Sequence, residues 1–349
     1  MARPPVTAAE IFPASKSVAG NADAGRSTTQ WPTPLRASAF HGVIGDIVKT
    51  IEPNTEADPA ALLVQMLVML GSVIGRTAHF TVGADTHYLN LNAGIVGSTA
   101  KGRKGVSRGQ AQSVFAPIDP DWTQRCITSG LSSGEGLIWA IRDPIEKYQA
   151  VKEGGRVTDY QVVTEDRGVS DKRFLVVEPE LASTLKVMAR EGNTLSPVIR
   201  QAWDGHDLRT LTKTSTAKAT APHISIIGHV TRDELRRYFD ATEAANGFGN
   251  RFLWVCARRS RELPDGGSHV DLARYVERLR TSVHHGRQAH AMSRDDEAST
   301  RWHRVYGPLS AGRPGMLGAM TARAEAQVMR VACHNRLSHL GHIVTVRAS

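Results

Sequence analysis

A basic, glycine-rich loop at residues 97–107 (GSTAKGRKGVS) contains the residue types that hold phosphate. Gly97 and Gly102 have the spacing of the common phosphate-binding motif G-x-x-x-x-G-K-[ST]. Arg103 stands where that motif has lysine, and Lys104 comes one residue later. The motif is therefore present in outline, with altered spacing after its second glycine.

The last residues of the loop determine which side chains could bind phosphate and magnesium. Gly105 replaces the hydroxyl residue of the motif. If the loop holds one extra residue, Lys104 supplies the cation and Ser107 the hydroxyl that binds magnesium. Lys101 and Arg103 then add positive field or point outwards. The alternative is a basic glycine turn that grips nucleic-acid phosphate.

Two glutamates follow an apolar segment at residues 174–177. A nucleotide hydrolase needs one carboxylate near magnesium and another to orient the attacking water, and Glu178 and Glu180 are candidates for both roles. Pro179 separates them, and the alternative is that Glu180 begins the next helix, where a carboxylate suits the helix dipole.

Three further polar residues lie next to predicted strands. His229 and Thr231 end the segment ISIIGHVT, where a sensor residue contacts the γ-phosphate or water, and Thr231 also suits a helix N-cap. Arg251 follows a glycine-containing turn and is a candidate arginine finger for a neighbouring subunit. The alternative for Arg251 is a structural ion pair.

The elements that position these residues alternate between helices and strands. Residues 40–51 have helical apolar spacing, and Asp58 followed by Pro59 predicts the start of a second helix that ends near Gly75. Apolar strands are predicted before the glycine loop, before the two glutamates, in the segment that ends with His229 and Thr231, and in the segment after Arg251. Helices are predicted between these strands. This alternation predicts an α/β fold with a parallel sheet covered on both faces, and residues 145–172 are expected to form a surface hairpin or excursion.

Composition restricts the classes of function. The chain has 349 residues and a net charge of +9, which favours polyanionic partners. Its three cysteines are far apart, so we expect neither a disulfide framework nor a cysteine zinc site. This use of cysteine suits a reducing compartment, and we expect a cytoplasmic location. No segment predicts a membrane span or a signal peptide.

Four ordered blocks resemble one family: GSTAKGRKGVS, the segment from LVVEPELAS to RQAWDG, HISIIGHVTRDELRR and NGFGNRFLW. It is a family of uncharacterised P-loop proteins, found alone or fused to primase–polymerase modules in bacteria, phages and plasmids, that are similar to RecA-type replicative helicases. The resemblance covers roughly residues 40–330. It implies a RecA-like P-loop NTPase core that binds ATP and magnesium, acts on single-stranded DNA, forms a ring of identical subunits and works with a primase–polymerase partner.

Composition and apolar spacing predict an organisation of the chain, and the resemblance implies a set of roles. We expect a flexible segment at residues 1–38, a helical lead-in at 39–85, the ATPase core at 86–262 and a helical C-terminal segment at 263–349. Lys104 and Ser107 correspond to the P-loop, Glu178 or Glu180 to the acidic strand end, His229 and Thr231 to sensors and Arg251 to the finger. Residues 333–349 show no clear period, so we expect the preceding helix not to continue there and the terminus to be truncated or frameshifted.

Parts of the sequence also fit two other functions. A metal-dependent phosphoesterase would use Asp204, His206 and His229, although their spacing lacks the usual helical pair of histidines. A replication initiator or scaffold would bind nucleotide or DNA without hydrolysis. The polar loop that carries Arg209, Lys213 and Lys218 is the candidate contact with DNA, with solvated surface charge as the alternative.

Overall fold

Five parallel strands form the central sheet of the computed structural model, which describes residues 31–98, 102–210, 217–239 and 241–339. From edge to edge the order is β11 (Phe252–Ala257), β3 (Asn92–Gly97), β10 (His223–Thr231), β7 (Arg173–Glu178) and β4 (Ile127–Thr128). Counted along the chain, this order is fifth, first, fourth, third, second. The predicted α/β class with a parallel sheet is confirmed.

The position of β3 places the glycine loop near the middle of the sheet. Strand β3 pairs in parallel with β10 on one side and β11 on the other, and all of its residues are buried. Gly97 ends the strand in register with Thr231 of β10 and Ala257 of β11. The loop therefore begins at the carboxyl edge of the sheet, between two neighbouring strands.

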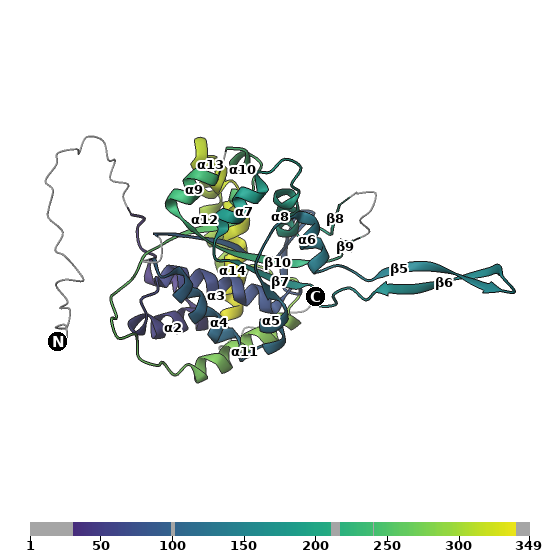
Figure 1. Cartoon of the computed structure of the whole chain (residues 1–349). Coiled ribbons are helices and arrows are strands. Elements are labelled where there is room, and N and C mark those ends of the chain that lie inside the picture. The colour runs from purple at the N-terminus through teal and green to yellow at the C-terminus, as the bar shows by residue number, and fades with distance from the viewer. Residues whose placement is uncertain (1–30, 99–101, 211–216, 240, 340–349) are drawn as a thin grey trace, which may run out of the picture. The chain divides into compact units, whose positions relative to one another are not determined.

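Side chains of β10 alternate between two hydrophobic layers, as a buried strand requires. Ile224 and Ile226 belong to one layer, whereas Ile227 belongs to the other, on the same side as His223 and His229. Figure 1 shows helices on both sides of the sheet. On the side of Ile227 lie α2 (Gly42–Ile51), α3 (Pro59–Ile74), α4 (Lys104–Phe115) and α5 (Pro120–Arg125); on the other lie α6 (Gly134–Ala140), α7 (Leu181–Met188), α8 (Leu195–Asp204) and α9 (Arg232–Tyr238).

The predicted helical lead-in packs directly on the sheet. Helix α3 begins as expected, with the Asp58 carboxylate accepting a hydrogen bond from the Ala60 amide at 2.9 Å and Pro59 in the first turn. Every residue from Ala61 to Ile74 is buried, because α3 contacts α4 and four strands of the sheet. The helix therefore belongs to the same hydrophobic core as the strands.

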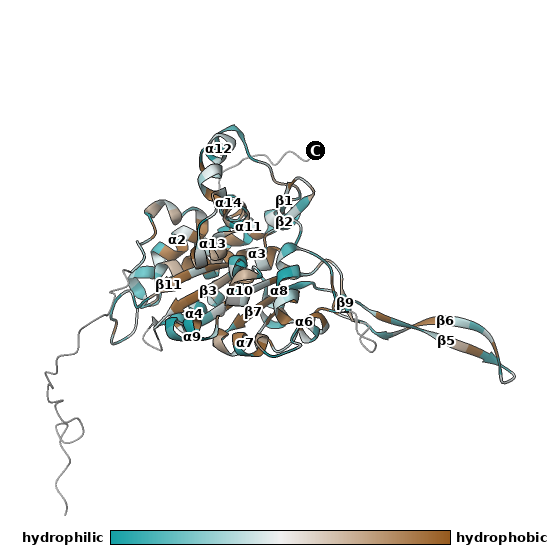
Figure 2. Ribbon diagram, turned by 90° about the horizontal axis from the view of Figure 1, so that it is seen from above, coloured by the Kyte–Doolittle hydropathy of each residue, from teal (hydrophilic) through white to brown (hydrophobic). Residues whose placement is uncertain are grey.

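In the described ranges, three antiparallel strand pairs accompany the sheet: β1 (His79–Val82) with β2 (Asp85–Tyr88), β5 (Ile145–Glu153) with β6 (Arg156–Asp166), and β8 (Leu208–Arg209) with β9 (Lys218–Ala219). The β5–β6 hairpin confirms the predicted excursion and extends away from the sheet (Figures 1 and 2). Its two-residue turn, Gly154 and Gly155, has φ values of 57° and 83°, which only glycine adopts readily.

The C-terminal part is helical, as predicted, with α11 (Ala273–Gln288), α12 (Asp296–Ser310), α13 (Gly315–Thr321) and α14 (Ala324–Ser338). The expectation that the last helix stops before residue 333 is wrong. Helix α14 continues through Cys333, His334 and Leu337, all of them buried against the core, so tertiary packing rather than local periodicity decides its length. Residues 340–349 lie outside the described residues, as do residues 1–30 of the predicted flexible segment.

The remaining elements are short connections: η1 (Ala37–Ala39), η2 (Glu52–Asn54), α10 (Ala241–Ala245) and η4 (Gly249–Arg251).

Candidate functional site

Lys104 lies at the end of the glycine loop and bridges back to its start. It is the first residue of α4, and its Nζ donates a hydrogen bond to the Ser98 carbonyl at 2.7 Å, so the side chain joins the two ends of the loop. Burial lowers the pKa of the Lys104 ammonium, and the carboxylate of Glu234 opposes that shift. Residues 99–101, including the predicted ligand Lys101, lie outside the described residues.

The glycines leave the start of α4 open. A Cβ on Gly97 would lie 2.7 Å from the Ala257 carbonyl of β11, so this position admits only glycine without a shift. A Cβ on Gly102 would contact Ser98 Oγ at 3.5 Å, whereas one on Gly105 would have no neighbour within 4 Å. The first turn of α4 contains no acidic residue, and its free amides favour an anion. This arrangement can hold phosphate.

Arg103 does not fit the predicted role of a phosphate ligand. It adopts a left-handed conformation with φ of 50° and forms an ion pair with Glu56, which precedes α3. Glu56 also accepts a hydrogen bond from the Leu263 amide at 3.0 Å and lies 3.8 Å from Arg259. Arg103 therefore ties the loop to the N-terminal helical part.

Ser107 does not fit the predicted role of a magnesium ligand. Its side chain is only 1% exposed. Its Oγ donates to the Lys104 carbonyl at 2.7 Å and accepts from Gln65 Nε2 at 2.7 Å. The first interaction lies within α4 and the second joins it to α3, so the hydroxyl is buried between the two helices.

His229 and Gln65 form a buried hydrogen bond behind the loop. His229 Nε2 lies 3.0 Å from Gln65 Oε1, and the histidine is 3% exposed. Burial, followed by the positive charges of Lys104 and Arg108, lowers the pKa of His229 to about 4. The imidazole is therefore neutral at physiological pH. Gln65 was missed in the sequence, although it is a polar residue within the apolar run of α3.

Thr231 forms a capping box at the start of α9. Its hydroxyl accepts from the Glu234 amide at 3.2 Å, and the Glu234 carboxylate accepts from the Thr231 amide at 3.0 Å. The N-cap alternative for Thr231 is thus confirmed. Glu234 was missed, although a T-x-x-E spacing is a recognisable signal. Its carboxylate is the acid that influences Lys104, and Lys104 in turn helps to lower the pKa of Glu234.

The two predicted glutamates have different environments. Glu178 is 6% exposed, and its Oε1 accepts hydrogen bonds from the amides of Gly130 and Leu131 at 2.7 and 2.8 Å. Glu180 is exposed just before α7, and its carboxylate has no partner among the described residues. One glutamate therefore anchors the segment after β4, and the other is open to solvent.

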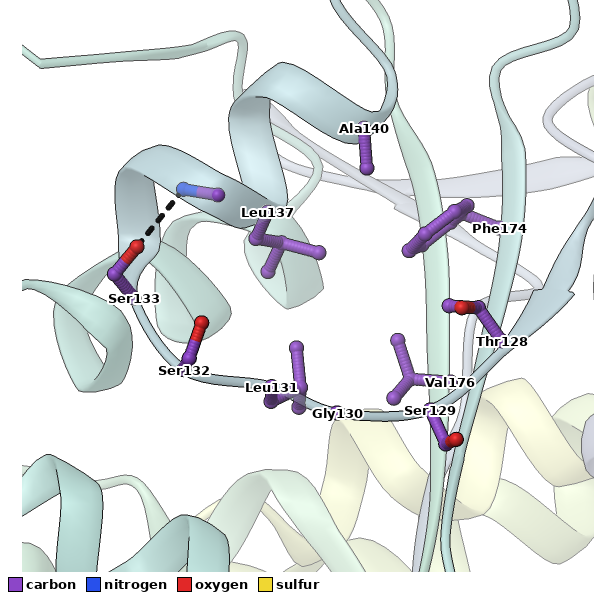
Figure 3. Close-up of a pocket in the computed structure, with 11 residues that line it drawn as sticks. Thr128, Ser129, Gly130, Leu131, Ser132, Ser133, Leu137, Ala140, Phe174 and Val176 are labelled. Carbon is purple, nitrogen blue, oxygen red and sulfur yellow. Dashed lines mark hydrogen bonds between the residues drawn. The ribbon is translucent and has the colours of Figure 1, made fainter.

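A small pocket of about 160 Å³ lies beside the Glu178 anchor, between β4, β7 and α6 (Figure 3). Leu137, Phe174 and Val176 line it, and its rim carries Ser132 and Ser133. The Ser133 hydroxyl caps α6 by accepting a hydrogen bond from the Gly136 amide at 3.0 Å. The pocket has a mixed polar and apolar lining and does not include the glycine loop.

Arg251 does not fit the predicted role of an arginine finger. It is 6% exposed, pairs with Asp204 Oδ2 at 2.6 Å and donates to the Gly247 carbonyl at 2.7 Å. It also leads into β11, at the amino edge of the sheet, whereas the glycine loop leaves the carboxyl edge. A finger must reach a neighbouring subunit, so the structure favours the structural alternative.

The alternative metal site is not assembled. Asp204 is paired with Arg251 and Arg323, His206 is exposed, and His229 is bonded to Gln65. Over the described ranges, no group of three or more histidine, cysteine, aspartate or glutamate side chains could hold a metal.

The predicted DNA contacts lie on the β8–β9 hairpin. Arg209 and Lys218 face each other across its two strands, and both are exposed. Lys218 Nζ is 4.0 Å from Asp143, and Lys213 lies outside the described residues. Because this hairpin precedes β10, it lies at the amino edge of the sheet, opposite the glycine loop.

No protein-family model matches the chain, and no curated protein matches it significantly. In the part of the chain that the structure describes, no helix combines the length and apolar character needed to cross a bilayer.

Proposed function

We propose that the chain is a P-loop NTPase with a RecA-like core that binds and hydrolyses ATP. The observation that supports this most is the position of Lys104 at the start of α4, with its ammonium on the Ser98 carbonyl at the end of the central strand β3. An anion that enters the loop can take the place of that carbonyl and pair with a partly desolvated cation.

The order of the sheet supports the NTPase part of the proposal. Strand β10 lies between the strand that leads into the loop and the strand that carries Glu178. A nucleotide hydrolase needs a carboxylate and a residue that contacts the attacking water near its phosphate loop, and this order brings candidates for both to one edge of the sheet. The position of β10 places His229 and Thr231 beside the loop, where sensor residues would lie.

The residues divide the work in the following way. Lys104 and the first amides of α4 hold the terminal phosphates, and Glu180 orients the attacking water. The free Oε2 of Glu178 contributes to the shell of magnesium, which neutralises phosphate charge when bound. Neutral His229 donates through Nε2 to Gln65 Oε1, which leaves Nδ1 to accept a hydrogen bond from a water molecule beside the γ-phosphate without adding charge.

The biological setting of the proposal comes from the sequence resemblance. We infer that the ATPase acts on single-stranded DNA in the cytoplasm, in replication of a mobile element, as a ring that works with a primase–polymerase partner. The net charge of +9 and the exposed Arg209 and Lys218 support a polyanionic partner.

A second candidate is a replication initiator or scaffold that holds nucleotide or DNA without hydrolysis. The buried position of Ser107 favours it, because the described loop then lacks the hydroxyl that normally binds magnesium.

Phosphate release from ATP, with and without single-stranded DNA, separates the two candidates. For the ATPase, Lys104→Ala lowers turnover by about 100-fold or more, as expected for loss of a cation that stabilises phosphate charge. Arg103→Ala is the matched control and keeps most of the turnover, since Arg103 faces Glu56. If the unaltered chain binds DNA and releases no phosphate, the ATPase proposal is wrong and the scaffold remains.

A further inference from the structure

The pocket beside the Glu178 anchor has a lining that suits a flat, uncharged molecule. Leu137, Phe174 and Val176 point into it from α6 and β7 (Figure 3). None of the residues that line it is charged, so an ion that entered would lose water without gaining a partner. Apolar walls with a few polar groups at the edge are typical of sites for small ligands.

Hydroxyl groups supply the polar edge of the pocket. Thr128 and Ser132 line it from different sides, and neither hydroxyl has a hydrogen-bond partner among the described residues (Figure 3). The Ser133 hydroxyl accepts from the Gly136 amide, which leaves its own proton available to a ligand. Because a hydroxyl both donates and accepts, this edge fits the mixed donors and acceptors of a heterocyclic ring.

The Glu178 carboxylate holds this polar edge in place. Its Oε1 accepts hydrogen bonds from the Gly130 and Leu131 amides at 2.7 and 2.8 Å, and Glu178 itself is buried. The segment between β4 and α6 is therefore fixed before a ligand arrives. Groups that are already in position lower the entropic cost of binding.

The volume of the pocket limits the size of the ring. It is about 160 Å³, and a cavity of about 150 Å³ holds one benzene molecule. One six-membered ring therefore fits, whereas the two fused rings of a purine exceed the space. Phe174 supplies an aromatic side chain against which a base can pack. A pyrimidine base has this size, no charge and a polar edge.

The pocket also lies beside the cations of the β8–β9 hairpin. Helix α6, which forms one wall of the pocket, contacts both β8 and β9. Just after this helix, the Asp143 amide donates to the Lys218 carbonyl at 2.8 Å, and Arg209 lies opposite Lys218. The Asp143 carboxylate pairs at 2.7 Å with Lys172 and only at 4.0 Å with Lys218, which keeps Lys218 available to a phosphate.

We propose that this pocket binds one pyrimidine base of single-stranded DNA, with Arg209 and Lys218 on the neighbouring phosphates. The inference rests on the proposed action on single-stranded DNA and adds a base preference, which phosphate contacts alone do not give. A base in a duplex is paired and stacked, so a single strand inserts its base at a lower cost. Binding needs no ATP and does not depend on hydrolysis.

Fluorescence anisotropy with labelled oligothymidylate and oligoadenylate of equal length, without ATP, tests the preference. The unaltered chain is expected to bind oligothymidylate about tenfold more tightly. Ala140→Leu fills the pocket, and it is expected to raise the Kd for oligothymidylate by about tenfold and abolish the preference. Ala298→Leu, the same change at an exposed position of α12, is the matched control and keeps the preference.

Two further variants separate the base from the phosphates. Thr128→Val removes one hydroxyl, keeps a residue that suits a strand, and is expected to weaken only oligothymidylate binding, by about threefold. It tests the pocket even if Ala140→Leu does not fold. Arg209→Ala with Lys218→Ala is expected to weaken both oligonucleotides by the same factor, because phosphates are the same in both.

Free thymidine distinguishes a base within a strand from a free nucleoside. Because it lacks the phosphates, it is expected to compete with oligothymidylate only at concentrations about 100-fold higher or more. Competition at equal concentration would make a nucleoside the ligand and overturn the proposal. Equal affinity for the two oligonucleotides, unchanged by Ala140→Leu, would overturn the base pocket and leave the DNA partner standing. A chain that binds neither oligonucleotide would overturn both.

Discussion

Charged side chains at the two edges of the central sheet differ in how fully they are paired within the protein. At the carboxyl edge, the Lys104 ammonium is bonded to a backbone carbonyl, and Glu180 has no partner among the described residues. At the amino edge, Arg251 is held by Asp204 and the Gly247 carbonyl. Both edges therefore carry a cation that sequence reasoning assigned to phosphate, and only the first leaves it available. A charged side chain that can still contact a ligand, such as Lys104, is suited to binding. A charged side chain that is fully paired within the protein, such as Arg251, stabilises the fold.

The two histidines of strand β10 also differ in the partners that hold them. His223 at its amino end is fully enclosed and bonds the Gly71 carbonyl at 2.9 Å. His229 near its carboxyl end bonds a side chain, Gln65, which also holds Ser107. The first contact fixes α3 to the sheet, and the second connects α3 to the loop.

The largest effect on stability is expected at the amino edge. Arg251→Met leaves Asp204 with only its 3.3 Å contact to Arg323, and breaking a buried ion pair costs about 3–5 kcal/mol. The free energy of unfolding, measured with urea, is expected to fall by that amount. Lys104→Met at the carboxyl edge is the control and changes it by less than about 1 kcal/mol, since the lysine has no carboxylate in direct contact. Equal losses in the two variants would contradict the difference between the edges.

Acid should weaken the fold through three buried histidines. Burial lowers the pKa of His223 to about 3, and those of His229 and His334 to about 4, so all three stay neutral in the folded chain. The unfolded chain takes up these protons as pH falls through about 6.5, so stability is full above that pH and declines below it. From pH 7.5 to 6.0 the expected loss is about 2 kcal/mol for the three together.

Urea titrations at the two pH values measure this loss. Replacing His229 by glutamine removes about a third of the difference, whereas replacing the exposed His303 leaves it unchanged. A pH-independent unfolding energy would contradict the neutral, buried state of these histidines.

Most of the fold follows from local patterns in the sequence. The Asp58–Pro59 start of α3 and the apolar strands each depend on a few neighbouring residues, and the structure confirms them. The end of α14 was missed, because Cys333 and His334 are buried by distant parts of the chain. Strand order also depends on long-range packing, and the sequence predicted only that the sheet is parallel.

The candidate site could be predicted less well, because residue type does not show which partner a side chain takes. Ser107 and Arg103 have suitable chemistry and adjoin the loop, but Gln65 and Glu56 of the N-terminal helical part occupy them. Arg251 follows a suitable turn, but its guanidinium forms an ion pair with Asp204, which is far away in sequence. Such pairings arise only when α3 and α8 pack beside these residues.

The two glutamates near the carboxyl edge give a smaller, paired test. Glu178→Ala removes the acceptor for two buried amides and is expected to cost about 1–2 kcal/mol of unfolding free energy. Glu180→Ala changes stability by less than about 0.5 kcal/mol, as for an exposed side chain without partners. If the chain hydrolyses ATP, Glu180→Ala also slows phosphate release while nucleotide affinity stays the same. A stable Glu178 variant would show that the segment after β4 does not need this anchor.

The smallest effect is expected on the shaft of the β5–β6 hairpin. Lys147 and Glu165 form an ion pair with side chains 65% and 49% exposed, whereas Arg142 and Asp166 at the base pair at 2.6 Å with side chains 18% and 25% exposed. Exposed pairs contribute about 0–1 kcal/mol, since water screens them. Lys147→Ala should change amide hydrogen exchange in the hairpin by less than about threefold, and Arg142→Ala should change it more, because its Nε and Nη2 both donate to one carboxylate. Equal exchange in the two variants would mean that the hairpin is held by its ladder of backbone hydrogen bonds rather than by the ion pair at its base.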